Sequence, residues 1–166
     1  MGPIKRTPAP RAVPTDLHTL ITDALGLYRG IFTEVDIRPR FAEGVPRVPV
    51  DGEQMRRVVI NLVDNAIEAM DQRGTIEIET HHDASNSLVR ITVADDGPGI
   101  PPEERDKLFL PYYSTKRRGS GLGLAIVRRI VIEHGGSIEV TANTPRGTRF
   151  VIELPCEGSP VRTALA

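Results

Sequence analysis

The chain has 166 residues, of which 39% are hydrophobic and 26% are charged. This length and composition are typical of a single globular domain. The formal net charge of −1 excludes a broad basic field, so we expect no nucleic-acid partner. No apolar stretch approaches the roughly 20 residues that span a bilayer, and no signal segment opens the chain. We therefore expect a cytoplasmic fragment that makes no direct membrane contact.

Residues 1–14 are rich in proline and also carry lysine and arginine. Proline disfavours both helices and ladder pairing, so this segment is interpreted as an interdomain linker. The expected domain covers residues 15–155, followed by a C-terminal tail at residues 156–166. The single cysteine, Cys156, cannot form an internal disulfide and is interpreted as a structural or incidental thiol.

The first half of the domain shows one helix, one strand and a second helix. Residues 17–28 carry apolar side chains at helical spacing, whereas residues 35–41 alternate like a strand. The proline inside that strand suits only a sheet edge. A capping-box-like pair, Asp51 and Gln54, predicts the start of a long amphipathic helix. We expect this helix to end near residues 72–74.

The second half is richer in strands, which are expected at residues 75–80, 88–94, 137–142 and 148–154. The polar segment 81–87 would join the first two as a hairpin. A short helix is expected at residues 101–109, with proline and acidic residues in its first turn. Another helix continues from Leu122 and can end in a left-handed cap at Gly135 and Gly136. The pattern predicts an α+β sandwich, a mixed and mostly antiparallel sheet with helices on one face.

Polar residues on the Asp51 helix form a separate stripe. Asn61, Asn65 and Glu68 fall at i, i+4 and i+7, away from the apolar face. Such a stripe is often only a solvated face. Its alternative role is chemical, because an asparagine amide oxygen is a neutral hard ligand that suits a Mg²⁺ already bound to phosphates and water.

A second candidate is the segment 95–100, Asp-Asp-Gly-Pro-Gly-Ile, directly after an expected strand. An acid at the strand end can accept a hydrogen bond from an exocyclic amine such as that of adenine, and the glycines let the backbone approach a flat ligand. The alternative is a tight turn, in which Asp-Gly and Pro-Gly are common.

A third candidate is the glycine-rich segment 119–124, which follows Lys116, Arg117 and Arg118 and precedes a helix. Free backbone N–H groups at a helix N-terminus favour phosphate. A flexible solvated loop is the alternative. The glycine spacing matches neither the dinucleotide fingerprint nor the P-loop.

Taken together, these segments resemble the conserved boxes of the ATP-binding catalytic domain of sensor histidine kinases. In order, the asparagine box, first glycine box, phenylalanine box and second glycine box correspond to residues 61–66, 95–100, 107–116 and 119–124. The resemblance covers about residues 15–155, and it is closest to nitrogen-regulation sensor kinases of the NtrB/NtrY sort. It implies the Bergerat (GHKL) fold, a two-layer α/β sandwich with a mobile ATP lid.

The resemblance also implies roles for individual residues. Asn65 would ligate Mg²⁺ with support from Asn61, and these two with Lys116 would be catalytic; Asp95 would bind the adenine amine, with Thr148 nearby through water. The full set of nucleotide-binding residues that it implies is Asn61, Asn65, Asp95, Gly97, Gly99, Ile100, Lys116, Ser120, Gly121, Leu122, Gly123, Leu124 and Thr148.

The resemblance further separates a kinase from a hydrolase. Hydrolysing relatives such as DNA gyrase B have glutamate where this chain has Asn61, and asparagine cannot act as a general base toward water. The expected reaction is therefore γ-phosphoryl transfer from Mg·ATP to a histidine on a separate dimerisation domain. A response regulator would act downstream, and a membrane anchor elsewhere in the parent protein is compatible with this organisation.

None of the four histidines has the sequence context of a phosphoacceptor, so we expect all of them to be surface or structural residues and expect no autophosphorylation by this chain alone. Two alternatives remain open. A hydrolysing ATPase would release phosphate unaided, and a non-enzymatic module would use the nucleotide only for regulation or partner docking.

Overall fold

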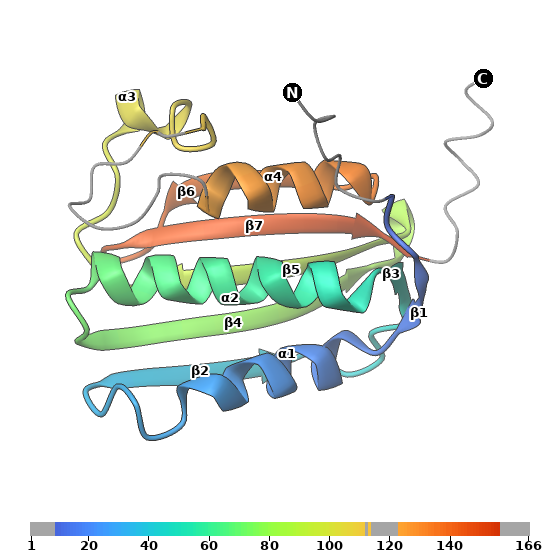
Figure 1. The fold of residues 1–166 in the computed structure, drawn as a ribbon, viewed down its shortest axis with the longest axis horizontal. Coiled ribbons are helices and arrows are strands. Elements are labelled where there is room, and N and C mark those ends of the chain that lie inside the picture. Colours follow the sequence, from blue (N-terminus) through green and yellow to red (C-terminus); the bar gives the residue numbers. More distant parts are fainter. Residues whose placement is uncertain (1–8, 112, 114–122, 157–166) are drawn as a thin grey trace, which may run out of the picture.

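The computed structural model describes residues 9–111, 113 and 123–156. Its main sheet has five strands in the order β2-β4-β5-β7-β6. The β2–β4 pair is parallel, and the other neighbouring pairs are antiparallel. The strands are β2 (Val35–Phe41), β4 (Gly74–Asp83), β5 (Leu88–Asp95), β6 (Ser137–Ala142) and β7 (Thr148–Pro155). Figure 1 shows this sheet behind the helices.

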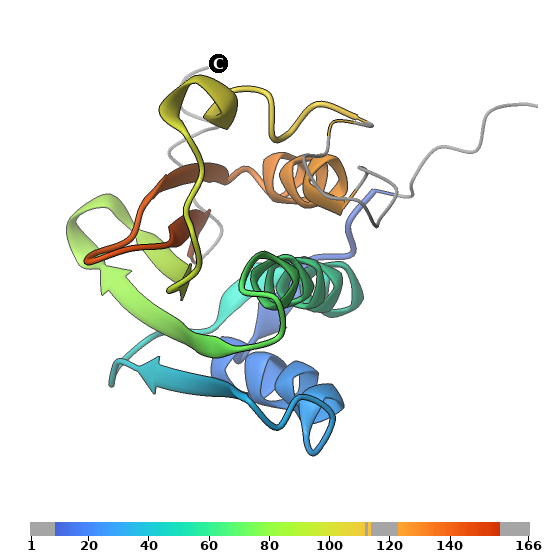
Figure 2. The same cartoon turned by 90° about the vertical axis from the view of Figure 1, so that its left-hand side faces the viewer.

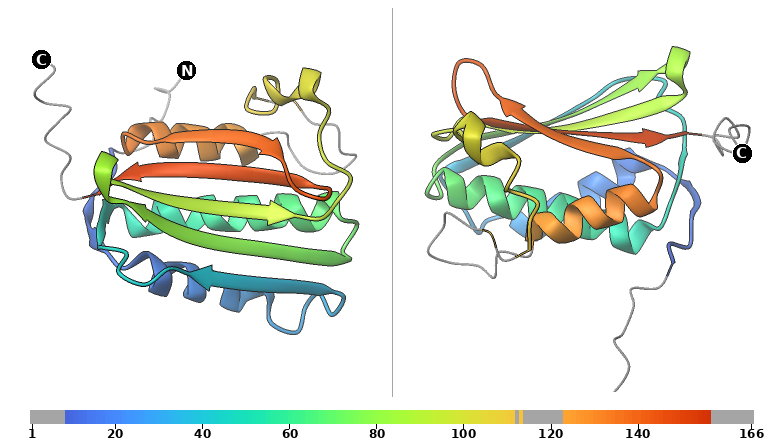
Figure 3. Two further views of the ribbon diagram at one scale, coloured as in Figure 1. Left: turned by 180° about the vertical axis from the view of Figure 1, so that it is seen from behind. Right: turned by 90° about the horizontal axis from the view of Figure 1, so that it is seen from above.

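Three helices cover one face of the sheet, as the view from above in Figure 3 makes plain. They are α1 (Leu17–Leu25), α2 (Gly52–Ala69) and α4 (Gly123–Glu133), and a 3-10 turn, η1 (Gly26–Tyr28), extends α1. The fully buried side chains come from both layers, among them Ile21, Leu62, Ile78, Ile91 and Ile152. The expected α+β architecture, a mixed sheet with helices on one face, is confirmed.

Three elements follow their sequence patterns closely. The strand β2 lies at the sheet edge, as its proline predicts. Helix α2 begins at the cap formed by Asp51, whose Oδ1 accepts a hydrogen bond from the N–H of Gln54 at 3.2 Å. Helix α4 ends where Gly135 adopts a left-handed φ of 77°, and the N–H of Gly136 donates to the Val131 carbonyl at 3.0 Å.

Some boundaries differ from expectation. Helix α2 ends at Ala69, before residues 72–74, because Asp71 and Gln72 take left-handed φ values of 56° and 63°. The N–H of Gln72 then closes the helix by donating to the Ile67 carbonyl at 2.9 Å. Strand β4 continues through Asp83, so that the 3-10 turn η2 (Ala84–Asn86) makes most of the connection expected at 81–87.

Helix α3 (Pro102–Arg105) is shorter than the expected helix at residues 101–109. Turns follow it: the N–H of Lys107 donates to the Glu104 carbonyl at 3.1 Å, and that of Leu110 donates to the Lys107 carbonyl at 3.0 Å. A run of i to i−3 bonds replaces the α-helical ladder there.

Both ends of the domain extend slightly past the range 15–155. Strand β1 (Val13–Thr15) pairs antiparallel with β3 (Val48–Val50), although the segment before residue 15 was interpreted as linker. At the other end Cys156 is buried, and its N–H donates to the Ser87 carbonyl at 3.0 Å. Both short strands owe their pairing to distant partners, which local sequence patterns do not reveal.

Candidate nucleotide-binding site

Asp95 is a buried carboxylate at the end of β5. It is only 3% exposed, and its Oδ1 accepts hydrogen bonds from the N–H groups of Gly97 at 2.9 Å and of Thr148 at 3.2 Å. Two backbone donors from different elements thus hold one oxygen in place. A buried carboxylate so oriented can accept a further hydrogen bond from an amine donor of a ligand.

The glycines after Asp95 are needed because the backbone runs close to its neighbours. A Cβ at Gly97 would lie 3.1 Å from the Asp95 Oδ1 and 3.3 Å from the Met70 Cγ. Gly99 has a left-handed φ of 84°, and a Cβ there would lie 3.3 Å from the carbonyl oxygen of Gly147. Gly97 therefore leaves little room for a larger side chain, and the left-handed backbone at Gly99 favours glycine.

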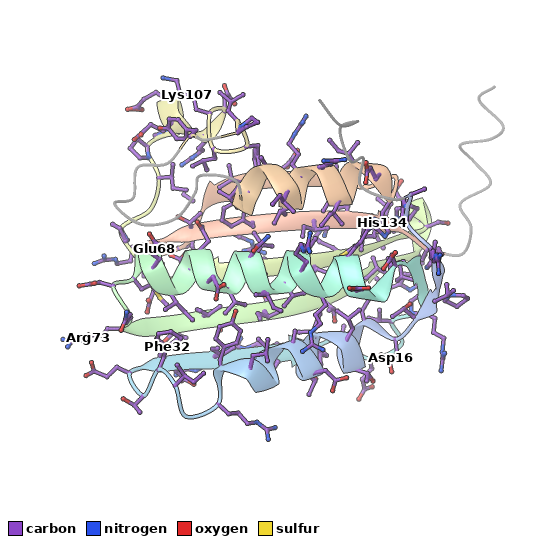
Figure 4. The ribbon with its side chains drawn as sticks, in the orientation of Figure 1. Asp16, Phe32, Glu68, Arg73, Lys107 and His134 are labelled. Atoms are coloured by element: carbon purple, nitrogen blue, oxygen red, sulfur yellow. The ribbon has the colours of Figure 1, made fainter. Side chains whose placement is uncertain are left out.

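The asparagine stripe lies on α2, on the side that faces the beginning of α4. Asn61 and Asn65 are both half-buried, and the Nδ2 of Asn61 lies 3.4 Å from the carbonyl oxygen of Gly123, the first residue of α4. Figure 2 looks along α2 and α4 and shows them side by side on one face of the sheet. Glu68 is exposed near the end of the same helix (Figure 4).

Helix α2 also connects the stripe to the Asp95 turn. A Cβ at Gly97 would lie 3.4 Å from the carbonyl oxygen of Ala69, the last residue of α2. Asn65 is four residues earlier, about 6 Å along the helix axis. The structure thus brings Asn65 and Asp95, expected to hold opposite ends of one ligand, to the same end of the domain.

Other predicted residues divide into described and undescribed groups. Thr148 is buried at 3% exposure, and Ile100 is half-buried after the glycine turn. Gly123 and Leu124 form the first turn of α4. The remaining candidates lie outside the described residues: Lys116, Arg117, Arg118, Ser120, Gly121 and Leu122.

The β6–β7 hairpin contributes two residues that the sequence interpretation missed. The Nδ2 of Asn143 donates to the Asp95 carbonyl oxygen at 2.8 Å, and the Nε of Arg146 donates to the Gly97 carbonyl oxygen at 3.0 Å. The segment 143–147, Asn-Thr-Pro-Arg-Gly, has only the composition of a turn. Its contact with the Asp95 turn depends on strand register.

The site also fits a Mg²⁺ ion that is bound mainly through phosphate. Within residues 9–111, 113 and 123–156, no group of three or more His, Cys, Asp or Glu side chains could hold a metal ion. Amide oxygens from the α2 stripe supply one or two neutral hard ligands, as Mg²⁺ bound to a nucleotide requires.

Comparison with known protein families agrees with this geometry. Residues 50–158 match the model of the histidine kinase-, DNA gyrase B- and HSP90-like ATPase family. The matched stretch includes α2, the Asp95 turn and Thr148. The chain belongs to this family. The description of this family is that of an ATPase, which agrees with a candidate nucleotide site between α2 and the end of β5.

Within the family the chain is similar to sensor histidine kinases. It is 38% identical to the sensor histidine kinase ZraS of Escherichia coli K12 over 142 residues, which cover 84% of this chain and 30% of ZraS. The chain thus spans about a third of the curated relatives it matches. The described part has no helix long and apolar enough to cross a bilayer.

Solved structures show the same relationship. The catalytic domain of the histidine kinase ThkA superposes with a TM-score of 0.80 at 35% identity, covering 87% of this chain and 95% of that one. Full-length ShkA in complex with AMPPNP superposes with a TM-score of 0.77 at 28% identity, covering 87% of this chain and 31% of ShkA. The chain is therefore a histidine kinase-type catalytic domain in fold and family.

ZraS and ThkA do not single out the NtrB/NtrY sort, and that subfamily assignment is replaced by the broader one.

Proposed function

We propose that this domain binds Mg·ATP and presents the γ-phosphoryl group to a histidine on a separate dimerisation domain. The observation that carries the proposal is the Asp95 carboxylate, which is buried and held by two backbone N–H groups at the end of β5. An AMPPNP complex of the similar kinase ShkA supports the choice of an adenosine triphosphate.

Each described residue has a role in this proposal. Asp95 accepts the hydrogen bond of the adenine amine, while Thr148 donates its N–H to the same carboxylate and keeps it oriented. Gly97 and Gly99 leave room for the base. Mg²⁺, when bound, neutralises the charge that develops on the phosphate oxygens. Asn65 holds that ion, and Asn61 supports it.

The lid side of the site completes the proposal. Lys116, with Arg117 and Arg118 as further candidates, would neutralise phosphate charge, and Ser120, Gly121 and Leu122 would surround the phosphates with Gly123 and Leu124. Gly123 begins the 11-residue helix α4, whose N-terminal N–H groups favour an anion. Stabilisation of phosphate charge and positioning of the γ-phosphoryl group are the expected sources of catalysis.

Asn61 argues for transfer rather than hydrolysis. An amide cannot take a proton from water, so the domain is expected to hold ATP until a nucleophile arrives. Two of the four histidines make structural contacts. His18 stacks on Phe41 with ring centroids 4.3 Å apart, and both ring nitrogens of His134 contact backbone atoms. We therefore expect no autophosphorylation by this chain alone.

The proposed partners follow from the same comparison. ThkA has been solved in complex with the response regulator TrrA, and this chain covers 42% of that ThkA chain with a TM-score of 0.76. By analogy, a response regulator would receive the phosphoryl group from this kinase. The domain would act in the cytoplasm, and its parent protein would be compatible with a membrane anchor. We expect no nucleic-acid partner.

Calorimetric titration with ATP and Mg²⁺ tests the binding step. Asp95→Asn should weaken ATP binding by about ten-fold or more, because it replaces the carboxylate acceptor with an amide. Asp96→Asn is the matched control: Asp96 is the next residue, is exposed, and accepts a hydrogen bond from the N–H of Thr75 at 3.1 Å. An absence of heat with the wild type, or equal losses in both variants, would contradict the proposal.

Radiolabelled ATP distinguishes the reaction classes. A kinase transfers the label to a histidine of a dimerisation domain added in trans, whereas a hydrolysing ATPase releases phosphate steadily without that domain. A non-enzymatic module binds ATP and does neither. Transfer of label that depends on Asp95 is the expected result.

A further inference from the structure

The hairpin between β6 and β7 packs directly on the turn that carries Asp95. Asn143, the residue directly after β6, donates from Nδ2 to the Asp95 carbonyl oxygen at 2.8 Å. Arg146, two residues before β7, donates from Nε to the Gly97 carbonyl oxygen at 3.0 Å. The two side chains thus bind the carbonyl oxygens of the residues before and after Asp96, and together they bracket the turn.

The hairpin itself is closed and cannot retreat from this contact easily. The N–H of Asn143 donates to the Gly147 carbonyl oxygen at 3.0 Å. Gly147 has a φ of 110°, and a Cβ there would overlap the carbonyl oxygen of Asp95. The next residue, Thr148, donates its N–H to the Asp95 carboxylate. Residues 143–148 therefore contact both the main chain and the side chain of Asp95.

Two side-chain hydrogen bonds add to these main-chain contacts. A cavity of about 620 Å³ opens between the hairpin and residues 98–101, and Asn143 and Arg146 are part of its lining. Arg146 is exposed, and Asn143 is half-buried. Because open space borders the turn here, removing either donor would leave it free to shift. A recognition group must be held within a fraction of an ångström by its supporting residues.

We infer that Asn143 and Arg146 are positioning residues that set the preference of this site for adenine over guanine nucleotides. The inference rests on the proposed ATP-binding function. Adenine offers an amine donor where guanine offers a carbonyl acceptor, so an oriented Asp95 carboxylate attracts the first and repels the second. Neither hairpin residue needs to touch the base, because both act through the turn that holds Asp95.

The consequence for binding differs between the two nucleotides. Loosening the turn weakens a hydrogen bond that only ATP makes, so ATP affinity falls. GTP never makes that bond, so its affinity stays constant or rises as the repulsion relaxes. The charge of Arg146 attracts both triphosphates alike. Removing this charge therefore weakens ATP and GTP binding by the same factor and leaves the ratio of the two affinities unchanged.

The test is to measure dissociation constants for ATP and GTP on the whole chain by calorimetry with Mg²⁺, alongside the melting temperature. For Asn143→Ala and for Arg146→Ala we expect the ATP dissociation constant to rise about five-fold or more while that of GTP changes less than about two-fold. Arg146→Lys, which keeps a charged donor, should restore part of the ratio. Thr141→Ala, at an exposed position on β6 just before the hairpin turn, is the control and should leave the ratio unchanged.

The outcomes separate this inference from the proposed function. If the variants melt earlier but keep the wild-type ratio of ATP to GTP affinity, the hairpin is only structural and the inference is overturned. If the wild type binds no ATP, the proposed function fails and the inference falls with it. If Asn143→Ala does not fold, the ratio of ATP to GTP affinity measured for Arg146→Ala, a change at an exposed residue, decides whether the inference holds.

Discussion

His134 accepts a hydrogen bond at Nε2 from the backbone N–H of Asp51 at 3.0 Å, and its Nδ1 donates to the Ile130 carbonyl oxygen at 2.8 Å. These two bonds place a ring proton on Nδ1 and leave Nε2 as the acceptor. They join the C-terminal end of α4 to the cap of α2 (Figure 4). His134 therefore anchors the helix that carries Asn61 and Asn65.

The first prediction concerns this anchor. His134→Ala should lower the free energy of unfolding by about 1–3 kcal/mol, because the half-buried N–H of Asp51 loses its acceptor. Denaturant unfolding followed by circular dichroism measures the change. The control is His81→Ala, since His81 is exposed and its replacement should stay within about 0.5 kcal/mol. Equal unfolding midpoints for the two variants would contradict the anchoring role.

The second prediction concerns the acid sensitivity of the α2 cap. The hydrogen bond from the Arg11 N–H, aided by that from Gln54, holds the pKa of the Asp51 carboxyl below its ordinary value of 3.8. A lowered folded-state pKa stabilises the fold above the unfolded value, and this contribution disappears as the pH falls through the folded value. The stability advantage of wild type over Asp51→Asn should therefore be full at neutral pH and shrink below about pH 4.

Unfolding curves from pH 7 to pH 3 measure that advantage. Asp23→Asn, on the exposed surface of α1, controls for the general loss of one negative charge. An advantage over Asp51→Asn that grows on acidification would contradict the sign of the effect. At neutral pH, Asp51→Ala should cost about 0.5–2 kcal/mol, the usual cost of losing a helix cap.

The third prediction concerns Gly147. Alanine there would be strained at a φ of 110°, and its Cβ would overlap the carbonyl oxygen of Asp95. Gly44→Ala is the matched control: Gly44 has a left-handed φ of 77°, but a Cβ there would meet nothing within 4 Å. The control should lose about 1–2 kcal/mol from backbone strain alone and keep its ATP affinity. Gly147→Ala should lose more stability, and its ATP affinity should fall as well; retained affinity in a folded variant would contradict the prediction.

The fourth prediction concerns Mg²⁺. Asn65→Ala should remove most of the enhancement that Mg²⁺ gives to ATP binding while leaving affinity without Mg²⁺ nearly unchanged, because only the ion loses a ligand. Titrations with Mg²⁺ and with chelator measure both values. Glu53→Gln, about 18 Å away along the same helix, is the control. An equal Mg²⁺ effect in wild type and Asn65→Ala would assign the ion to other residues.

Amphipathic periodicity accounts for most of what the sequence predicted correctly. The expected strands at 35–41 and 137–142 coincide with β2 and β6, and the apolar face of α2 is buried from Met55 to Ile67. These segments have strong local patterns that agree with their tertiary positions, so the pattern alone sufficed. The order of the polar motifs likewise pointed to the family that the comparison shows.

Long-range contacts account for what the sequence did not predict. Strand β1 exists because Val13 pairs with Val50, 37 positions away, and no local signal announces that pairing. The same holds for Asn143, whose bond to Asp95 crosses 48 positions of the chain. Its neighbourhood has the composition of an ordinary turn, and its contact with the candidate site depends on the registers of both β5 and β6 on β7.

The Asp51 carboxylate joins α2 to the chain that enters the domain. Its Oδ2 accepts the N–H of Arg11 at 3.0 Å while its Oδ1 caps the helix. Tension or rotation applied along residues 9–11 would therefore act first on the opening turn of α2. That helix is 18 residues long and ends against the glycine turn beside Asp95, so one continuous helix links the entering chain to the turn that carries the candidate recognition carboxylate.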